Sequence, residues 1–413
     1  MCSSHNSPMR HCMVVYSIYP LGETRVQREA EALIRHGYEV DVICLRLLGE
    51  QAIDEYKGVK IYRQKFCFPF GLMKNKGLFE KFFNYLRFFI TAGIRVTQLH
   101  FTKNYSTIQV HNLPDFLVFC TLIPKLLRIP IILDLHDLMV EFYAGRFGEK
   151  GSLGAWLIRL QEGIACKYAD HVITVSEHWR QALIKRGVPE EKCSVVMNVA
   201  DDQIFRPPNG NRPSKQTHQG FRLIYHGSMQ QRYGLDLVVQ AVDQVRHEIP
   251  DVQLSLVGEG PFLPALQELV VKLGLQEHVC IEPPHLAEDL PTIINSCDLG
   301  VVPYRTDVFT DGLVPTKLME YAAMELPAIA ARTTAIQNYF TVTNVEFFEP
   351  GSVDDLSRCI LLLYNNPNRM EELSRGSQNF NQRYNWAKIG AEYVALVEKL
   401  GKQGRPTNNK AAQ

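Results

Sequence analysis

The sequence predicts an α/β protein made of two domains, each with an open and mostly parallel β-sheet. At 413 residues the chain is too long for one typical hydrophobic core. Short β-rich apolar runs alternate with helical patterns along nearly the whole length, which indicates βαβ units. A polar segment rich in proline and glycine, 206–220, interrupts this alternation and is typical of a linker. Two domains of this kind would face each other across a cleft, with ligands beyond the carboxyl ends of the strands.

The elements follow from the apolar pattern in chain order. In the first half the predicted strands are 12–18, 39–45, 59–62, 107–110, 130–135, 171–175 and 194–197, and the helical stretches include 25–36, 78–96, 153–168 and 177–186. In the second half the predicted strands are 221–225, 252–257, 278–281, 299–302 and 328–331. The sequence therefore predicts one domain over 1–205 and another over 221–385. The last residues, 401–413, are polar, and we expect them to be disordered.

Composition excludes several classes of protein. Hydrophobic residues make up 46% and charged residues 21%, as in ordinary globular proteins, and the formal net charge of +0 gives no global attraction for nucleic acid. The ten cysteines form no C-x-x-C pair, so we expect no zinc site, and free thiols in a reducing cytoplasm. Residues 1–11 lack the apolar core of a signal peptide, and no apolar run is long enough for a membrane span.

The segment 314–327 holds a helix start, a cation and a carboxylate within two turns. Pro315 suits the first helical position, and the free N–H groups of the first turn form an anion site. Lys317 adds a positive charge, and the spacing puts Thr316, Lys317 and Glu320 on one face. A diphosphate needs the cation and N–H groups, and a carboxylate can accept hydrogen bonds from two ribose hydroxyls. The segment predicts a nucleotide-diphosphate site; an ordinary surface helix with a solvated Lys–Glu pair is the alternative.

Two histidines stand at predicted strand ends. His136 follows the run 131–135, where a parallel strand delivers side chains to a ligand site, and a neutral imidazole there could accept a hydrogen bond from a substrate hydroxyl. Asp134 or Asp137 could orient its other nitrogen. His111 stands at the end of the strand 107–110. Each histidine could instead merely cap its strand.

A second cation and two glycines stand near strand-to-helix turns. Arg232 follows the strand 221–225, where a guanidinium could bind phosphate, although it could also be a solvated surface arginine. Gly258 and Gly260 follow the strand 252–257, but Leu263 stands where a dinucleotide fingerprint needs a third glycine. The sequence therefore does not predict a nicotinamide cofactor, and it contains no G-x-x-x-x-G-K-[ST] phosphate loop.

Apolar residues at helical spacing run through 78–96. They are Leu78, Phe79, Phe82, Phe83, Leu86, Phe89, Ile90 and Ile94, and the basic residues among or beside them are Lys74, Lys76, Lys81, Arg87 and Arg95. The range 74–96 could lie on an anionic membrane surface, or the stripe could be a core face of the domain.

Motifs from both halves resemble family 4 glycosyltransferases of the GT-B fold, and the likeness covers about residues 12–400. In the first half these motifs are 24–33 with 37–40, 111–115, 134–138 and 169–176; in the second they are 225–228, 256–261 and 315–327. The resemblance implies two Rossmann-like domains facing across a cleft, with an acceptor-binding domain first and a nucleotide-sugar-binding domain second. It also implies that a final helix, 386–400, returns to the first domain.

The same resemblance implies retaining transfer of a sugar from a nucleotide-diphosphate sugar, without a metal or other cofactor. Glu320 would hold the ribose, Arg232 and Lys317 would neutralise the leaving diphosphate, and His136 would stand near the reacting sugar. The implied donor-binding residues are Gly227, Ser228, Arg232, Gly258, Asp311, Gly312, Leu313, Thr316, Lys317 and Glu320. The implied acceptor-binding residues are Arg25, His111, Asn112, Asp115 and Asp137.

Several positions depart from the family pattern. Arg232 stands where many members have a lysine, the segment 198–201 lacks the usual glycine, and the loop 22–25 lacks the usual glycine pair. Gly312 stands where many members carry a second glutamate, with Asp311 as the nearest carboxylate, and Ser228 replaces an arginine. We expect a cytoplasmic enzyme of polysaccharide or glycoconjugate biosynthesis that works at the inner membrane face on a glycan or lipid-linked acceptor. A nucleotide-sugar epimerase and a non-catalytic partner subunit are the alternatives.

Overall fold

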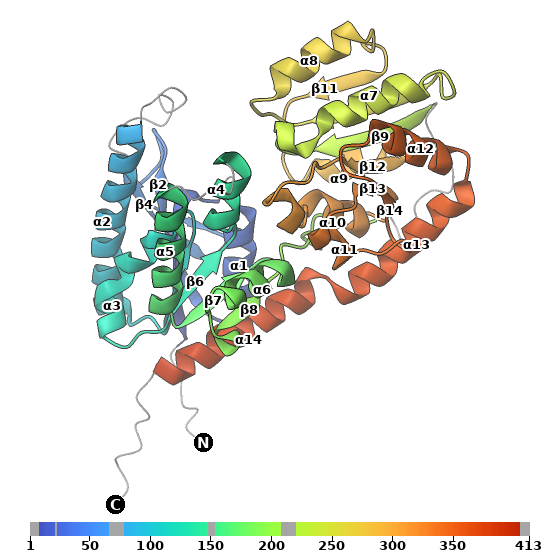
Figure 1. The fold of residues 1–413 in the computed structure, drawn as a ribbon. Coiled ribbons are helices and arrows are strands. Elements are labelled where there is room, and N and C mark those ends of the chain that lie inside the picture. Colours follow the sequence, from blue (N-terminus) through green and yellow to red (C-terminus); the bar gives the residue numbers. More distant parts are fainter. Residues whose placement is uncertain (1–7, 21–22, 66–77, 148–152, 208–219, 405–413) are drawn as a thin grey trace, which may run out of the picture. The chain divides into compact units, whose positions relative to one another are not determined.

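A computed structural model of the chain describes residues 8–20, 23–65, 78–147, 153–207 and 220–404. The chain divides into two compact units. The first unit combines Met1–Met197 with Lys388–Gln413, and the second is Asn198–Ala387. Each unit is an α/β structure built on a largely parallel sheet, which confirms the predicted fold class (Figure 1).

The first unit contains an eight-stranded sheet in the order β3-β4-β2-β1-β5-β6-β7-β8. All neighbouring strands are parallel except β3, which pairs antiparallel with β4. The strands are β1 (Arg10–Ile18), β2 (Glu39–Arg46), β3 (Ile53–Tyr56), β4 (Val59–Lys65), β5 (Thr107–His111), β6 (Ile131–Leu135), β7 (His171–Thr174) and β8 (Cys193–Val195). The helices are α1 (Thr24–Arg35), α2 (Leu78–Lys103), η2 (Asp115–Thr121), α3 (Leu122–Leu126), α4 (Met139–Phe147), α5 (Leu153–Tyr168), α6 (Glu177–Lys185), η3 (Glu190–Lys192) and α14 (Trp386–Gly404).

The second unit contains a six-stranded parallel sheet in the order β11-β10-β9-β12-β13-β14. Its strands are β9 (Phe221–His226), β10 (Val252–Val257), β11 (Val279–Glu282), β12 (Leu299–Val302), β13 (Ala328–Ala331) and β14 (Glu346–Phe348). Its helices are η5 (Gln231–Tyr233), α7 (Leu235–Val245), α8 (Leu263–Lys272), α9 (Leu290–Asn295), η6 (Thr310–Gly312), α10 (Thr316–Ala323), α11 (Thr334–Gln337), α12 (Val353–Tyr364) and α13 (Pro367–Arg383).

The central strands are buried along their whole length. Every residue of β5, β6, β7, β12 and β13 is buried, since both faces of a parallel sheet are covered by helices. This is why β12 and β13 read as continuous apolar runs in the sequence, whereas β5, β6 and β7 also carry buried polar residues. Burial of each Val, Leu or Ile side chain stabilises its unit by about 1.5–3 kcal/mol.

Each sheet reverses its strand order once, and this reversal positions the residues of interest. In the first unit the chain builds outward from β1 to β2 and β4, then returns to place β5, β6 and β7 on the other side. In the second unit β9 is followed by β10 and β11 on one side and by β12 and β13 on the other. Ligands of open α/β sheets bind where the order reverses, which is here beside the ends of β1 and β5 and of β9 and β12.

Some elements differ from the sequence prediction. The strands β3 and β14 were not predicted, and α2 extends to Lys103. The final helix runs to Gly404, so 401–404 are helical and not part of a disordered tail; 405–413 lie outside the described residues, as do 208–219 of the predicted linker. Within the described ranges, no helix has the length and apolar character needed to cross a membrane. The described cysteines are free thiols.

Candidate active site

The helix α10 carries the predicted cation and carboxylate of the second unit. It begins at Thr316 with Pro315 as its N-cap, one position later than the sequence predicted. Successive residues of a helix are turned by about 100°, and the environments of the first two differ accordingly: Thr316 is exposed, whereas Lys317 is buried. Glu320, one turn on, is half-buried. Thr316 was predicted to lie on the same face as Lys317, but its side chain is exposed where that of Lys317 is buried.

The ammonium of Lys317 is enclosed by three tyrosines from three different elements. Its Nζ donates a hydrogen bond of 2.9 Å to the hydroxyl of Tyr304, which follows β12. The same Nζ lies 4.8 Å from the ring centre of Tyr225, 5.1 Å from that of Tyr304 and 5.6 Å from that of Tyr233. Burial lowers the pKa of Lys317 to about 8, although Tyr233 and Glu320 act in the opposite direction. Cation–π contacts stabilise the charged form in this partly dehydrated place.

Glu320 lies beside the histidine that ends β9. Its Oε2 is 3.2 Å from Nε2 of His226. Burial, with the charge of Lys317, lowers the pKa of His226 to about 3, so the imidazole is neutral at ordinary pH. The contact is therefore between a carboxylate and a neutral ring. The ring of His226 also packs edge-on against Tyr321 of α10, at 5.3 Å, which fixes the helix against the sheet.

Two predicted glycines bring the ends of β9 and β10 into contact. The backbone of Gly258 has a φ of +145°, and a Cβ there would lie 2.0 Å from the carbonyl oxygen of Gly227. Only glycine fits such an approach. A Cβ at Gly227 would lie 3.5 Å from Cε of Lys317, so the exposed backbone of Gly227 borders the lysine. Ser228 is exposed, and its carbonyl accepts a hydrogen bond of 2.7 Å from Tyr225.

Arg232 is the second predicted phosphate ligand, and it lies on η5 beside the tyrosine cluster. Its guanidinium is 5.3 Å from the ring centre of Phe309. The neighbouring Tyr233 stacks on Tyr304 with ring centres 4.6 Å apart. Tyr304 in turn bonds Lys317, and Arg232 directly precedes Tyr233. The two predicted cations, Arg232 and Lys317, therefore lie at the same end of the second sheet.

The loop before α10 places the remaining predicted donor residues. Asp311 on η6 accepts a hydrogen bond of 2.8 Å from the backbone N–H of Thr334, at the start of α11. One carboxylate oxygen of Asp311 is therefore occupied in joining two elements, which argues against a simple replacement for the absent glutamate at 312. Gly312 is buried at the end of η6, and Leu313 is half-buried in extended backbone.

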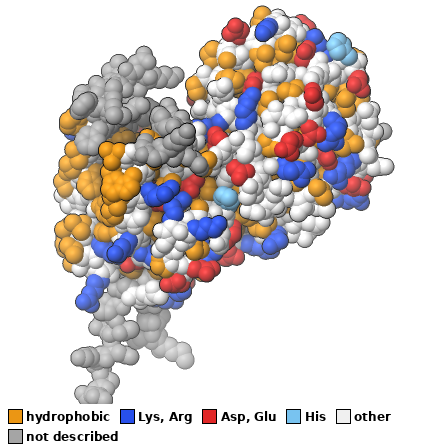
Figure 2. All heavy atoms as spheres, viewed as in Figure 1, with side chains coloured by type: hydrophobic (Ala, Val, Ile, Leu, Met, Phe, Trp, Pro, Cys, Tyr) orange, Lys and Arg blue, Asp and Glu red, His pale blue; other side chains and the backbone are white. Residues whose placement is uncertain are grey.

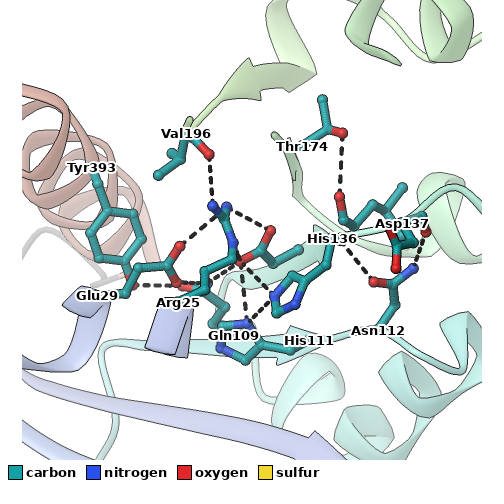
Figure 3. Close-up of polar contacts among 12 residues, drawn as sticks. Arg25, Glu29, Gln109, His111, Asn112, His136, Asp137, Thr174, Val196 and Tyr393 are labelled. Atoms are coloured by element: carbon teal, nitrogen blue, oxygen red, sulfur yellow. Dashed lines mark hydrogen bonds and ion pairs between the residues drawn. The ribbon is translucent and has the colours of Figure 1, made fainter. Parts of the chain in front are cut away.

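In the first unit, a buried polar cluster surrounds Asp134 at the end of β6. Figure 3 shows its members Arg25, Gln109, His111 and His136. Arg25 of α1 forms a two-bond ion pair with Asp134, with distances of 3.0 Å and 2.9 Å. The Arg25 guanidinium also lies 3.2 Å from Glu29 and donates to the carbonyl of Val196 at 2.7 Å. Although burial acts to raise it, the Arg25 charge holds the pKa of Asp134 well below its usual range. Asp134 therefore stays ionised at the strand end, paired with the Arg25 charge.

His111 and His136 meet at this carboxylate. Nδ1 of His111 is 3.0 Å from Nε2 of His136, and these atoms are 3.2 Å and 3.4 Å from Oδ2 of Asp134. Two N–H groups facing each other at 3.0 Å would repel, so at most one of these two nitrogens carries a proton. This leaves Nδ1 of His136, whose side chain is 20% exposed, for a substrate.

The two imidazoles differ in their affinity for protons. Burial lowers the pKa of His111 to about 4. Burial would likewise lower the pKa of His136, but the Asp134 carboxylate raises it above its usual value. Of the pair, His136 is therefore the one that can carry a proton near neutral pH.

Asn112 fixes the backbone around His136. Its Oδ1 accepts from the backbone N–H of His136 at 2.8 Å, and its Nδ2 donates to the carbonyl of Asp137 at 2.6 Å and to Asp115 at 3.0 Å. Burial raises the pKa of Asp115 to about 6. Burial also raises the pKa of the half-buried Asp137. The carboxylate that orients the His136 ring is that of Asp134, not that of Asp137.

This arrangement revises the predicted acceptor-binding set. Arg25, His111, Asn112 and Asp115 are each less than a tenth exposed. Arg25 bonds to Asp134 and Glu29, whereas His111 contacts His136, and Asn112 joins Asp115 to the backbone of His136. They are placed to position His136 and not to touch an acceptor directly.

Several residues of the cluster were not predicted. Gln109 of β5 donates to Glu29 at 2.7 Å and to Asp134 at 3.1 Å, and accepts from the Tyr393 hydroxyl of α14 at 2.7 Å. In the second unit, Tyr304 and Phe309 were also missed. The available signal for Gln109 was a polar residue inside an otherwise apolar strand, two positions from His111.

The sequence analysis also did not predict a grouping of metal-ligand type. The ligand atoms of His111, Asp134 and His136 all lie within 4.8 Å of one another. However, both oxygens of Asp134 already contact Arg25, whose positive charge opposes a second cation there. The geometry favours a histidine pair oriented by a carboxylate.

Comparisons with known proteins agree with the two-unit fold. The family model described as Glycosyltransferase Family 4 matches residues 22–203, and the one described as Glycosyl transferases group 1 matches 220–366. A D-inositol 3-phosphate glycosyltransferase of Catenulispora acidiphila is 25% identical over 76% of this chain and 77% of its own.

Solved structures show the same fold. Sucrose-phosphate synthase from Thermosynechococcus elongatus superposes with a TM-score of 0.77 at 18% identity, covering 96% of this chain and all of that one. HepE of Anabaena, solved with UDP, has a TM-score of 0.69 at 16% identity, covering 95% of this chain and all of that one. With both family models matched in order over the two units, the chain belongs to family 4 of the GT-B glycosyltransferases.

Proposed function

We propose that the protein is a retaining glycosyltransferase that moves a sugar from a nucleotide-diphosphate sugar to a glycan or lipid-linked acceptor, without a metal. The observation that carries the donor assignment is the arrangement of Lys317 and Glu320 on α10. One turn of helix places a caged ammonium and a half-buried carboxylate at the carboxyl end of the second sheet. These are the groups that a diphosphate and a ribose require.

Each donor-side residue has a role that follows from its charge. Lys317 and Arg232 would neutralise the diphosphate as it leaves, and stabilisation of developing charge is usually the largest single contribution to catalysis. Glu320 would accept hydrogen bonds from the ribose hydroxyls. Gly227, whose exposed backbone borders Lys317, would allow the nucleotide to approach closely, and Gly258 would hold this backbone through its contact with Gly227. HepE of Anabaena was solved with UDP, which supports a nucleotide diphosphate as ligand.

On the first unit, we assign His136 to the site of sugar transfer. Its Nδ1 would accept a hydrogen bond from a substrate hydroxyl. Asp134 and His111 would hold the ring in place. The match to a D-inositol 3-phosphate glycosyltransferase supports a hydroxyl acceptor, and we place the reaction in polysaccharide or glycoconjugate biosynthesis. A lipid-linked acceptor would bring a cytoplasmic enzyme to the inner face of the membrane.

Glu320→Gln tests the donor assignment directly. The variant keeps the shape of the side chain but loses its charge, which removes a charge-assisted hydrogen bond of about 1.5–3 kcal/mol. We expect the affinity for the donor, measured by calorimetry across a panel of nucleotide sugars, to fall about 10- to 100-fold. Glu268→Gln, at an exposed position of α8, is the matched control and should bind the donor as the wild type does.

Product analysis separates the proposal from its alternatives. An epimerase would convert the donor to its epimer when no acceptor is present, whereas a transferase would give only slow hydrolysis. Tight donor binding with no transfer to any acceptor pool would indicate a non-catalytic subunit. Donor affinity and turnover that are both unchanged in Glu320→Gln would overturn the proposal.

A further inference from the structure

The helix α2 presents apolar side chains on two sides. Phe88, Ala92, Val96 and Leu99 are buried against the first unit. The residues Phe83, Leu86, Ile90, Ile94 and Phe101 are exposed instead, and they recur at helical spacing. Phe83, Leu86, Ile90 and Ile94, four of the residues predicted as a candidate core face, therefore face outward; Lys74 and Lys76 lie outside the described residues, and so do the side chains of Leu78, Phe79, Lys81 and Phe82.

Two further helices of the first unit add exposed apolar side chains. On α3 and the residue after it these are Leu122, Ile123, Leu126 and Leu127, and on α5 they are Leu153, Trp156, Leu157, Leu160 and Ile164. Several are largely uncovered: Leu153 is 73% exposed, Leu126 70% and Trp156 58%. Most of the large apolar side chains exposed in the described structure belong to α2, α3 and α5. We call this set the apolar face.

Packing makes these three helices neighbours. The short helix η2 packs against both α2 and α5. The ring centres of Phe116 of η2 and Phe89 of α2 are 6.0 Å apart, and those of Phe119 of η2 and Tyr168 of α5 are 5.0 Å apart. The helix α3 continues directly from η2. Figure 2 shows hydrophobic side chains gathered over the part of the first unit that carries these helices. Contiguous exposed apolar surface of this kind marks an interaction site.

Most of the charges beside the apolar face are positive. Arg87, Arg128, Arg159 and Lys167 are exposed on or directly after these helices, and Asp170, which follows α5, is exposed and paired with Lys125 of α3. Among the side chains that the structure describes on α2, α3 and α5, the acidic one is Glu162, which is buried and bound to Arg186 at 2.6 Å. The chain as a whole has a formal net charge of +0, so this excess of positive charge is local.

We propose that the apolar face of α2, α3 and α5 binds the surface of a bilayer that contains anionic lipid. Exposed apolar side chains interleaved with cations suit the boundary between acyl chains and negatively charged headgroups. Trp156, near the start of α5, has the amphipathic ring that is enriched at that depth. This binding surface rests on the proposed function, which brings the enzyme to the inner face of the membrane. Binding to a vesicle requires neither the sugar donor nor the acceptor.

Vesicle flotation of the full chain tests the surface. The wild type should float with vesicles of phosphatidylcholine mixed with phosphatidylglycerol, and more weakly with phosphatidylcholine alone. The triple variant Trp156→Ser, Leu157→Ser, Leu160→Ser should bind the anionic vesicles at least about tenfold more weakly than the wild type does. Its control is Val271→Ser with Leu286→Ser, at similarly exposed apolar positions of the second unit, which should float as the wild type does.

A second variant separates charge from apolar contact. Arg128→Gln with Arg159→Gln and Lys167→Gln should lose the preference for phosphatidylglycerol and keep the weaker binding to phosphatidylcholine. Wild type that does not float, or a triple serine variant that floats normally, would overturn the proposal. A wild type that self-associates in sedimentation and does not float would assign the face to a second copy of the chain. Nucleotide-sugar binding measured on the same variants reports separately on the proposed function.

Discussion

The Lys317 ammonium and the Tyr304 hydroxyl form a hydrogen bond of 2.9 Å inside the second unit. The two residues are 13 positions apart and come from α10 and from the end of β12. Together with the rings of Tyr225 and Tyr233, this bond fixes where a positive charge stands at the edge of the sheet. Lys317 is thus held in place before any ligand arrives, which reduces the cost of ordering a long side chain on binding.

Tyr304→Phe should weaken donor binding without unfolding the protein. The variant keeps the ring beside Lys317 and removes only the hydroxyl that orients the ammonium. Loss of one such hydrogen bond is worth about 0.5–1.5 kcal/mol, so we expect the donor dissociation constant to rise about 2- to 12-fold. Tyr364→Phe, at an exposed tyrosine of the same unit, should leave it unchanged in calorimetry. Equal effects of the two variants would contradict the assigned role.

Donor affinity should fall as the pH rises above about 8. Burial lowers the pKa of Lys317 to about 8, so the charged form that binds a diphosphate is fully present below that pH and is lost above it. Burial raises the pKa of Tyr225 and of Tyr304, and His226 titrates near 3, so these groups do not change charge in this range. The decrease should approach about tenfold per pH unit. It should be absent in Lys317→Arg, because arginine stays charged, and a fall retained in that variant would assign it to another group.

The rate of sugar transfer should rise with pH in the acidic range through the titration of His136. A hydroxyl can donate to the neutral imidazole and not to the protonated one, and the Asp134 carboxylate raises the pKa of His136. The rise should therefore be centred above about 6.5, the ordinary pKa of histidine. His136→Gln should remove this acidic limb and lower kcat/KM by about 10- to 100-fold. His36→Gln, at an exposed histidine of the same unit, serves as the control and should keep the profile.

Gly258→Ala should strongly destabilise the second unit. The new Cβ would lie 2.0 Å from the carbonyl oxygen of Gly227, in a backbone conformation that L residues rarely adopt. We expect a loss of more than about 3 kcal/mol in the free energy of unfolding, measured by denaturant titration. At Gly274 the φ is also positive, +65°, but a Cβ would meet nothing within 4 Å. Gly274→Ala should therefore cost only about 1 kcal/mol, and similar costs at both positions would show that crowding is not the cause.

The sequence predicted the central strands well because both of their faces are buried. It missed β3, whose residues Ile53–Tyr56 are exposed or half-buried, and β14, which is only three residues long. Neither has the apolar run by which a buried strand is identified.

The candidate site was predicted in part, for reasons that lie in local spacing. Lys317 and Glu320 are three positions apart on one helix, so their relation could be read directly. The tyrosines around Lys317 come from β9, η5 and the end of β12, and only the strand order brings them together. The sequence could have shown that Asp134, and not Asp137, orients His136. Residues two positions apart on a strand share a face, and Asp134 and His136 have that spacing.

The hydrogen bond between Tyr393 and Gln109 joins residues 284 positions apart. During synthesis, the whole of the second unit, Asn198–Ala387, leaves the ribosome before Tyr393 does. The hydroxyl satisfies the oxygen of Gln109, and the amide nitrogen of the same buried side chain donates to Glu29 and Asp134. The interior of the first unit is therefore completed last although its strands are made first. The order of synthesis and the order of completion are therefore reversed, and a chain cut short before residue 393 lacks the final polar contact of its N-terminal half.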